Sequence, residues 1–92
     1  MITAFLSPGH LRVVGHAGGE KGRDIVCAGV SALVGTLRYT LSAIDPGSSC
    51  RVEPGLADVR CTDKGAAAMA FCADGIRLIA QGYPEQVRTV TQ

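Results

Sequence analysis

One histidine and one cysteine, His16 and Cys27, lie close together in this 92-residue sequence and are separated by a glycine-rich segment. Cys27 follows Asp24 by three residues, and aspartate is a typical N-cap of a helix. A thiol in the first turn of a helix lies near the positive end of the helix dipole, which favours the nucleophilic thiolate. A histidine on a preceding strand could act as its base or counter-ion. The pair therefore indicates a cysteine hydrolase.

Both residues also have a structural interpretation. Free cysteine is among the most buried residue types, so Cys27 could be a small core residue. His16 could be a hydrogen-bonded histidine at a strand end. His10 lies in a Ser-Pro-Gly-His turn and is interpreted as solvated surface. A catalytic role requires Cys27 and His16 to meet, which spacing alone does not establish.

The elements that must position this pair form one small α+β domain covering residues 1–92. Hairpins joined by helices predict a two-layer sandwich, in which two helices cover one face of a mostly antiparallel sheet. The predicted order is β-β-α-β-β-α-β. The expected strands are 1–6, 11–17, 49–53, 56–62 and 87–90, and the expected helices are 25–43 and 64–81.

Apolar residues recur at three- and four-residue steps in the first predicted helix, which indicates one buried face. That stripe consists of Val26, Val30, Leu33, Leu37, Leu41 and Ile44. Asp45-Pro46-Gly47 is expected to end this helix. Gly75 is expected to interrupt the second helix near Asp74.

The segment 49–62 predicts a hairpin around Pro54-Gly55. A four-residue turn sets residues whose numbers sum to 111 opposite one another, so that Cys50 faces Cys61. A two-residue slip to a sum of 113 makes these two cysteines diagonal neighbours on one face. Both registers predict that the two thiols lie close together.

A longer motif surrounds the histidine and cysteine. Gly15-His16-Ala17, Gly22, Asp24-Ile25-Val26-Cys27-Ala28 and Val30-Ser31-Ala32-Leu33 follow one another in the order typical of the ribosomal-processing cysteine protease (Prp, or YsxB-like) family. The chain resembles that family along nearly its whole length, more weakly at Tyr83-Pro84. Gly29 departs from the family, which more often has alanine there; glycine inside a helix costs about 1 kcal/mol.

The resemblance implies a bacterial cysteine endopeptidase with Cys27 as nucleophile and His16 as catalytic base. It implies one peptide substrate, the N-terminal extension of the large-subunit ribosomal protein L-twenty-seven, cut after an apolar, aromatic-rich segment and before a small residue. It also implies a homodimer. No cofactor or metal is expected.

Two further residues are given supporting roles. Asp24 is predicted to cap the helix, which is typically worth about 1 kcal/mol, and an orienting role toward His16 stays open. Ser31 lies one helical turn beyond Cys27, so it either binds sulfur or substrate or has no role, and the resemblance favours a secondary site role. Backbone N–H groups at the helix start, including that of Cys27, are candidate oxyanion donors.

The glycines between His16 and Cys27 match no phosphate-binding motif. Gly18, Gly19 and Gly22 are interpreted as part of a lid over residues 18–23 that closes on an extended peptide. The alternative is a passive connecting loop.

Composition excludes several other functions. The net charge is +1 and aromatic residues make up 4%, so direct binding of nucleic acid is not expected. The N-terminus lacks the features of a signal peptide, and no apolar run approaches the roughly 18 residues of a membrane span. A cytoplasmic protein is therefore expected.

The four cysteines, at positions 27, 50, 61 and 72, match no zinc spacing and are expected to be reduced thiols. Two alternatives to a protease stay open: a non-catalytic ribosome- or protein-binding module, and a redox- or metal-responsive thiol protein.

Overall fold

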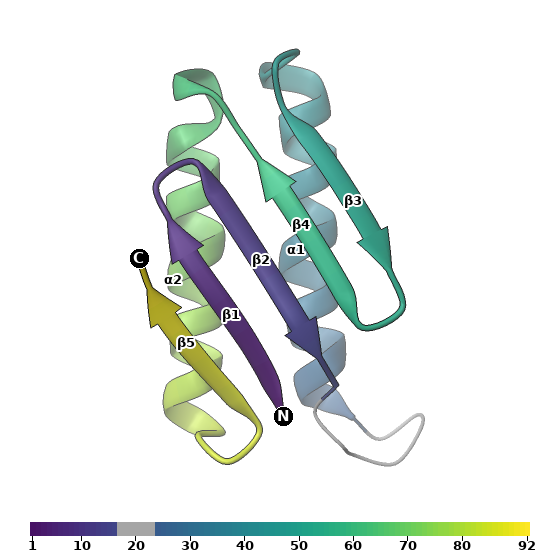
Figure 1. Ribbon diagram of the computed structural model, residues 1–92, viewed down its shortest axis with the longest axis vertical. Helices are drawn as coiled ribbons and strands as arrows, with labels where there is room; N and C mark the ends of the chain where they lie inside the picture. Colours follow the sequence, from purple (N-terminus) through teal and green to yellow (C-terminus); the bar gives the residue numbers. More distant parts are fainter. Residues whose placement is uncertain (17–23) are drawn as a thin grey trace.

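The computed structural model describes residues 1–16 and 24–92. Its helices and strands follow the predicted order, with one additional short 3-10 helix, η1, before the second helix (Figure 1). The elements are β1 (Ile2–Ser7), β2 (His10–Gly15), α1 (Ile25–Ile44), β3 (Ser49–Glu53), β4 (Leu56–Arg60), η1 (Asp63–Gly65), α2 (Ala66–Gly82) and β5 (Val87–Thr91).

The five strands form one sheet in the order β3-β4-β2-β1-β5, and both helices lie behind it on one face (Figure 1). All neighbouring strands are antiparallel except β1 and β5, which run parallel. The predicted two-layer α+β sandwich is confirmed. β3 and β5 are the edge strands, and β3 is the one beside α1 in Figure 1.

α1 packs one stripe of its surface on the core, as predicted, but the stripe differs from the prediction at three positions, one of which is Leu33, which is only partly buried. Val26, Val30, Val34, Leu37 and Leu41 are buried. Val34, which was not predicted, belongs to the stripe, whereas Ile44 is 45% exposed. Ile44 is the last helical residue, and the chain turns away from the core at Asp45.

α1 is long and apolar enough to cross a membrane by length and composition alone, contrary to the expectation from the sequence. Its buried stripe accounts for much of this apolar character. The exposed residues of α1 include polar Ser31, Arg38 and Ser42 as well as apolar Ile25 and Tyr39.

α2 runs without a break through Gly75, so the predicted interruption is wrong. A Cβ on Gly75 would lie 2.7 Å from the side chain of Leu33 on α1. Glycine at this position therefore lets the two helices approach closely. Its role is in packing, which the sequence does not distinguish from helix breaking.

The β3–β4 hairpin has a tighter register than either predicted one. Glu53 pairs with Leu56 across a two-residue turn, and Cys50 pairs with Val59 rather than with Cys61. Gly55 adopts φ +76°, which a tight turn with proline before it requires. This register also places Arg51 opposite Asp58, whereas the register summing to 111 would set arginine against arginine. Cys50 and Cys61 both pack against the core, as the predicted alternation of faces requires, whereas Val52 is half exposed.

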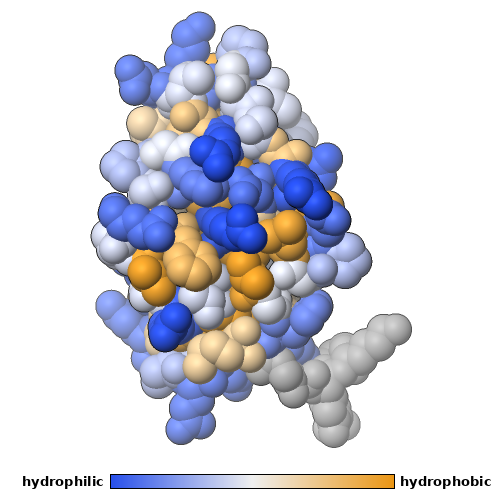
Figure 2. Space-filling view, in the orientation of Figure 1, coloured by the Kyte–Doolittle hydropathy of each residue, from blue (hydrophilic) through white to orange (hydrophobic). Residues whose placement is uncertain are grey.

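The sheet face opposite the helices carries a charged cluster centred on Asp58, within a surface of mixed hydropathy (Figure 2). His10 Nε2 lies 2.8 Å from Asp58 Oδ1, and Arg12 and Arg60 lie 3.6 and 3.8 Å from the same carboxylate. His10 is therefore hydrogen-bonded and partly buried, not simply solvated as the sequence predicted.

Asp45 links the end of α1 to the segment after β4. Its side chain is 1% exposed and accepts hydrogen bonds from Thr62 N (2.7 Å), Thr62 Oγ1 (2.8 Å) and Gly47 N (3.1 Å). Burial raises the pKa of the Asp45 carboxyl, but these hydrogen bonds outweigh burial and leave its pKa below the ordinary value. The charged carboxylate therefore stabilises the fold.

Replacing Asp45 by asparagine is expected to lower the free energy of unfolding at pH 7, because Asn has one acceptor oxygen for three donors. A carboxyl with a lowered pKa contributes stability above its unfolded pKa of about 3.9 and loses that contribution as the pH falls through the folded value. Urea unfolding at pH 7 and pH 3 would measure the difference in unfolding free energy between wild type and Asp45→Asn. This difference should be smaller at pH 3. Asp74→Asn, at a carboxylate 76% exposed, is the control. An equal difference in unfolding free energy at both pH values would contradict a stabilising role of the charged Asp45 carboxylate.

Candidate active site

His16 lies just past the end of β2, where Gly15 turns the chain. Gly15 has φ +103°, and a Cβ there would overlap the carbonyl oxygen of Met1. The Gly15 N–H donates to the carbonyl of Gly55 (2.9 Å), and the Met1 ammonium donates to the carbonyl of His16 (2.6 Å). The backbone around His16 is thus held between the N-terminus and the β3–β4 turn. These contacts explain why glycine precedes the histidine.

The imidazole of His16 rests against the β3–β4 turn. A Cβ built on Gly55 would lie 3.0 Å from His16 Nε2, so the turn glycine leaves room for the ring. Sequence reasoning missed Gly55 as part of the site. The Pro54-Gly55 pair predicted the turn, but only the sheet order β3-β4-β2 brings that turn beside the end of β2.

Cys27 lies in the first turn of α1, as predicted, and Asp24 caps that turn. Asp24 Oδ1 accepts a hydrogen bond from the Cys27 N–H at 2.9 Å, which confirms the capping role. The same bond corrects another prediction, because the Cys27 N–H donates to Asp24 and is not directed at a substrate oxyanion. The other N–H groups at the helix start stay candidate oxyanion donors.

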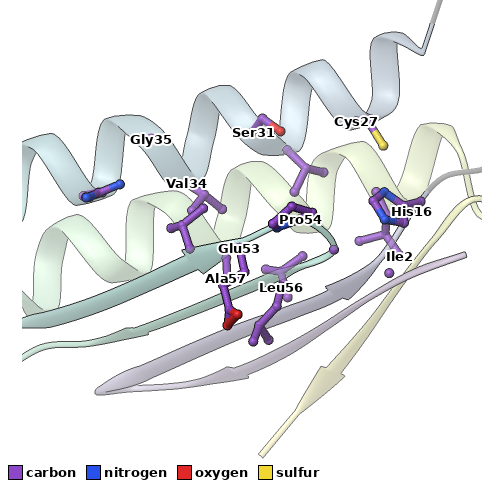
Figure 3. A pocket seen from close by; sticks show the side chains of 16 residues that line it. Ile2, His16, Cys27, Ser31, Val34, Gly35, Glu53, Pro54, Leu56 and Ala57 are labelled. Atoms are coloured by element: carbon purple, nitrogen blue, oxygen red, sulfur yellow. The ribbon is translucent and has the colours of Figure 1, made fainter. Parts of the chain in front are cut away.

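A groove of about 350 Å³ brings the candidate residues together. One wall is α1, with Cys27, Ser31 and Gly35, and the other is the β3–β4 hairpin; His16 lies at the end nearest Cys27 (Figure 3). In Figure 3 the Cys27 sulfur projects from the first turn of α1 toward the side on which His16 lies. The structure therefore places His16, Cys27 and Ser31 on one surface, as the catalytic prediction requires.

The predicted lid lies outside the described residues. Its glycines, Gly18, Gly19 and Gly22, fall in residues 17–23. Their assignment as a lid over bound peptide stays a prediction.

The other three cysteines have raised pKa values. Burial raises the pKa of Cys72 to about 11, and burial is also the main cause of the raised pKa of Cys50 and of Cys61. No disulfide joins the four cysteines, all of which lie in the described part of the chain. Nor do the described residues contain three His, Cys, Asp or Glu side chains placed to hold a metal ion.

The position of Cys27 at a helix start and the burial of Cys72 predict that these two thiols are alkylated at different rates. For Cys72, a rise in pKa from 9.0 to about 11 lowers the thiolate fraction at pH 7.5 roughly a hundredfold. Iodoacetamide should modify Cys27 at least about tenfold faster than Cys72, because only the thiolate reacts. Peptide mapping by mass spectrometry over time would give the four rates. Equal rates would favour the alternative of a redox-responsive thiol protein.

The fold and groove combine a cysteine at a helix start with a histidine at the end of a neighbouring strand, which is an arrangement suited to a cysteine protease. Comparison with known families agrees. The family model described as cysteine protease Prp matches residues 7–88, and the chain belongs to this family.

Solved structures share the whole fold. Ribosomal processing protease Prp from Staphylococcus aureus, with a covalently linked product peptide, superposes with a TM-score of 0.87 at 23% identity and 100% coverage of both chains. A second structure of that protease, with a substrate peptide, gives 0.79 at 19% identity, covering 99% of this chain and 97% of the other. A protein from Streptococcus mutans gives 0.81 at 28% identity, covering 100% and 99%. No curated protein matches the chain.

Proposed function

We propose that this protease is an endopeptidase that removes the N-terminal extension of the large-subunit ribosomal protein L-twenty-seven. The observation that carries the proposal is that His16 and Cys27 line one end of a groove that continues along α1. The structural relatives from Staphylococcus aureus are described as a ribosomal processing protease bound to peptides, which supports the same class of substrate here.

In the proposed reaction the Cys27 sulfur attacks the scissile carbonyl carbon while His16 accepts the thiol proton. His16 then protonates the departing amine, and the acyl group stays on sulfur as a thioester. Water activated by His16 hydrolyses the thioester, which releases the acid and restores the thiol. Asp24 holds the first turn of α1, and so the position of Cys27, through its hydrogen bond to the Cys27 N–H.

The groove favours an apolar peptide. Val30, Val34, Val52 and Leu56 all line it, with Arg38 and Glu53 among its charged residues. An extended segment of apolar side chains would bury them here, at about 25 cal/mol per Å² of apolar surface removed from water. The resemblance to the family implies a cleavage site in an apolar, aromatic-rich segment, which would fit this groove.

The test is to incubate the protein with a synthetic copy of that extension from the same organism and to identify the products by mass spectrometry. Cleavage at one bond, before a small residue, is expected. A scrambled peptide of the same composition is the control. An intact peptide after prolonged incubation with reduced protein would overturn the substrate assignment, as would equal cleavage of the scrambled copy.

We further propose that the protein works in the cytoplasm as a homodimer. Phe71 and Leu78 on α2 are 78% and 69% exposed, and Tyr39 on α1 is 78% exposed. These side chains give the helical face apolar area that a second copy would cover. Light scattering on the purified protein would measure the mass.

A further inference from the structure

The β3 strand is an edge of the sheet and lies beside the groove. Its turn fixes which backbone groups point outward. Because Glu53 and Leu56 pair directly across the two-residue turn, residues 53 and 51 direct their N–H and C=O groups to β4. The N–H and C=O of Val52 and Cys50 therefore point away from the sheet. The outer edge of β3 therefore presents N–H and C=O groups at every second residue, which is the spacing with which an added strand forms hydrogen bonds.

Val52 connects this edge to the candidate active site. Its side chain is 49% exposed and lines the same groove as His16 and Cys27, together with Glu53 and Pro54 of the hairpin. A peptide that pairs with the Val52 backbone would thus lie alongside the groove with alternate side chains directed into it. Such a ligand would account for an apolar side chain that is left half exposed in the same groove as Cys27.

The opposite wall of the groove is open at Gly35. A Cβ at Gly35 would meet no atom within 4 Å, whereas Gly29 and Gly75 in the two helices have side chains of the other helix within 3.2 Å. Glycine inside a helix costs about 1 kcal/mol relative to alanine, and packing within the described chain does not require it at position 35. The absence of a side chain at Gly35 leaves space for a peptide against α1.

We propose that the outer edge of β3 binds the substrate main chain as an added strand, with Val52 as the principal hydrogen-bonding residue. This inference rests on the proposed peptidase function and concerns how the peptide is held. Gly35 lies eight residues beyond Cys27, or roughly 12 Å along the helix. An extended peptide spans about 3.3–3.6 Å per residue, so the groove holds about four residues on one side of the scissile bond. Main-chain pairing fixes the register, and the groove selects apolar side chains.

The first test compares Val52→Pro with Val52→Ala. Proline removes the outward N–H, which an edge strand tolerates, whereas alanine keeps the N–H and shortens the side chain. Val52→Pro should raise KM for the extension peptide about 3- to 10-fold above that of Val52→Ala, the size expected for one lost hydrogen bond. Modification of Cys27 by iodoacetamide, which needs no peptide pairing, should not change.

The matched control is Thr89→Pro on β5, the other edge strand. The bonds from Ile2 N to Gln86 O and from Gln92 N to Leu6 O set the pairing of β5 with β1, and this leaves the Thr89 N–H outward. Thr89→Pro therefore removes an outward N–H far from the groove and should leave KM unchanged. Circular dichroism would verify that each variant is folded.

The second test uses the substrate. Single N-methyl groups are placed on successive residues of the extension peptide, each of which removes one peptide N–H. Strand addition predicts losses at alternate residues only, because every second N–H faces β3. Equal losses at successive residues, or no loss at any, would overturn the proposal.

Failure of the inference is distinguishable from failure of the proposed function. If wild type does not cut the peptide, the proposed substrate is wrong. If wild type cuts it and Val52→Pro has the KM of Val52→Ala, the function stands and strand addition is wrong. If light scattering gives Val52→Pro a different mass from wild type while its KM is unaltered, the β3 edge binds a second copy of the chain. That result would also overturn the proposal.

Discussion

Peptide cleavage is expected to fall by on the order of 10⁴-fold or more in Cys27→Ala, because this substitution removes the atom that forms the acyl bond. The fold should be retained, since Cys27 is only partly buried and alanine is a good helix former. Cleavage of the extension peptide under single-turnover conditions would measure the loss. Cys61→Ala, which changes a partly buried thiol outside the groove, should cut the peptide at close to the wild-type rate. A Cys27→Ala protein with the wild-type rate would end the protease assignment for this groove.

The same experiment extends to the two histidines of the chain. His16→Ala should lower the rate by about 10²–10⁴-fold, the usual contribution of a positioned general base. His10→Ala is the matched control, because His10 is bound to Asp58 on the opposite sheet face. The loss in His16→Ala should be smaller than in Cys27→Ala, since the thiol remains available. Equal losses in the two histidine variants would show that His16 has no special role.

The second large effect is expected at Gly15, where the chain turns just before His16. An added Cβ would overlap the carbonyl oxygen of Met1, and φ +103° is a conformation that alanine rarely adopts. Gly15→Ala should therefore cost about 1–3 kcal/mol of unfolding free energy, the usual cost of such backbone strain. It should also lower kcat on the order of 10²-fold, because relief of the clash displaces His16, and a shift of about 1 Å has an effect of that size.

Gly82→Ala is the matched control for Gly15→Ala. A Cβ at Gly82, the last residue of α2, would meet no atom within 4 Å, so stability and kcat should both be retained. Activities are compared well below both melting temperatures so that unfolding does not contribute. Gly15→Ala with a wild-type kcat would show that the position of His16 does not depend on this turn.

Much of the local structure followed from residue pattern alone. The 3.6-residue period of α1, the Asp24 cap and the alternation in the strands are local properties, since each depends on residues a few positions apart. The two-layer sandwich followed from the order of these elements. The strand order was decided by long-range pairing: β5 joins β1 in parallel across the whole chain.

Where sequence reasoning went wrong, one pattern was compatible with two physical outcomes. A glycine in a helix can interrupt the helix or let a neighbouring helix approach closely. The contact between Gly75 and Leu33 shows that Gly75 has the second role. The Pro54-Gly55 turn permits more than one register, and pairing with β2 on the other side of β4 helps to select the one observed. The Cys27 N–H could donate a hydrogen bond to a substrate oxyanion or to the Asp24 carboxylate, and in the structure it donates to Asp24.

The sequence by itself determined which residues could react: a cysteine at a helix start, its aspartate cap and a histidine after a glycine. Only the tertiary structure decided that they share a surface, because the distance between two elements depends on how each packs on the sheet. The same packing set the β3–β4 turn beside His16, and with it Gly55 and Val52. These two residues come from the opposite end of the sheet order from β5, and nothing in their local sequence connects them to Cys27.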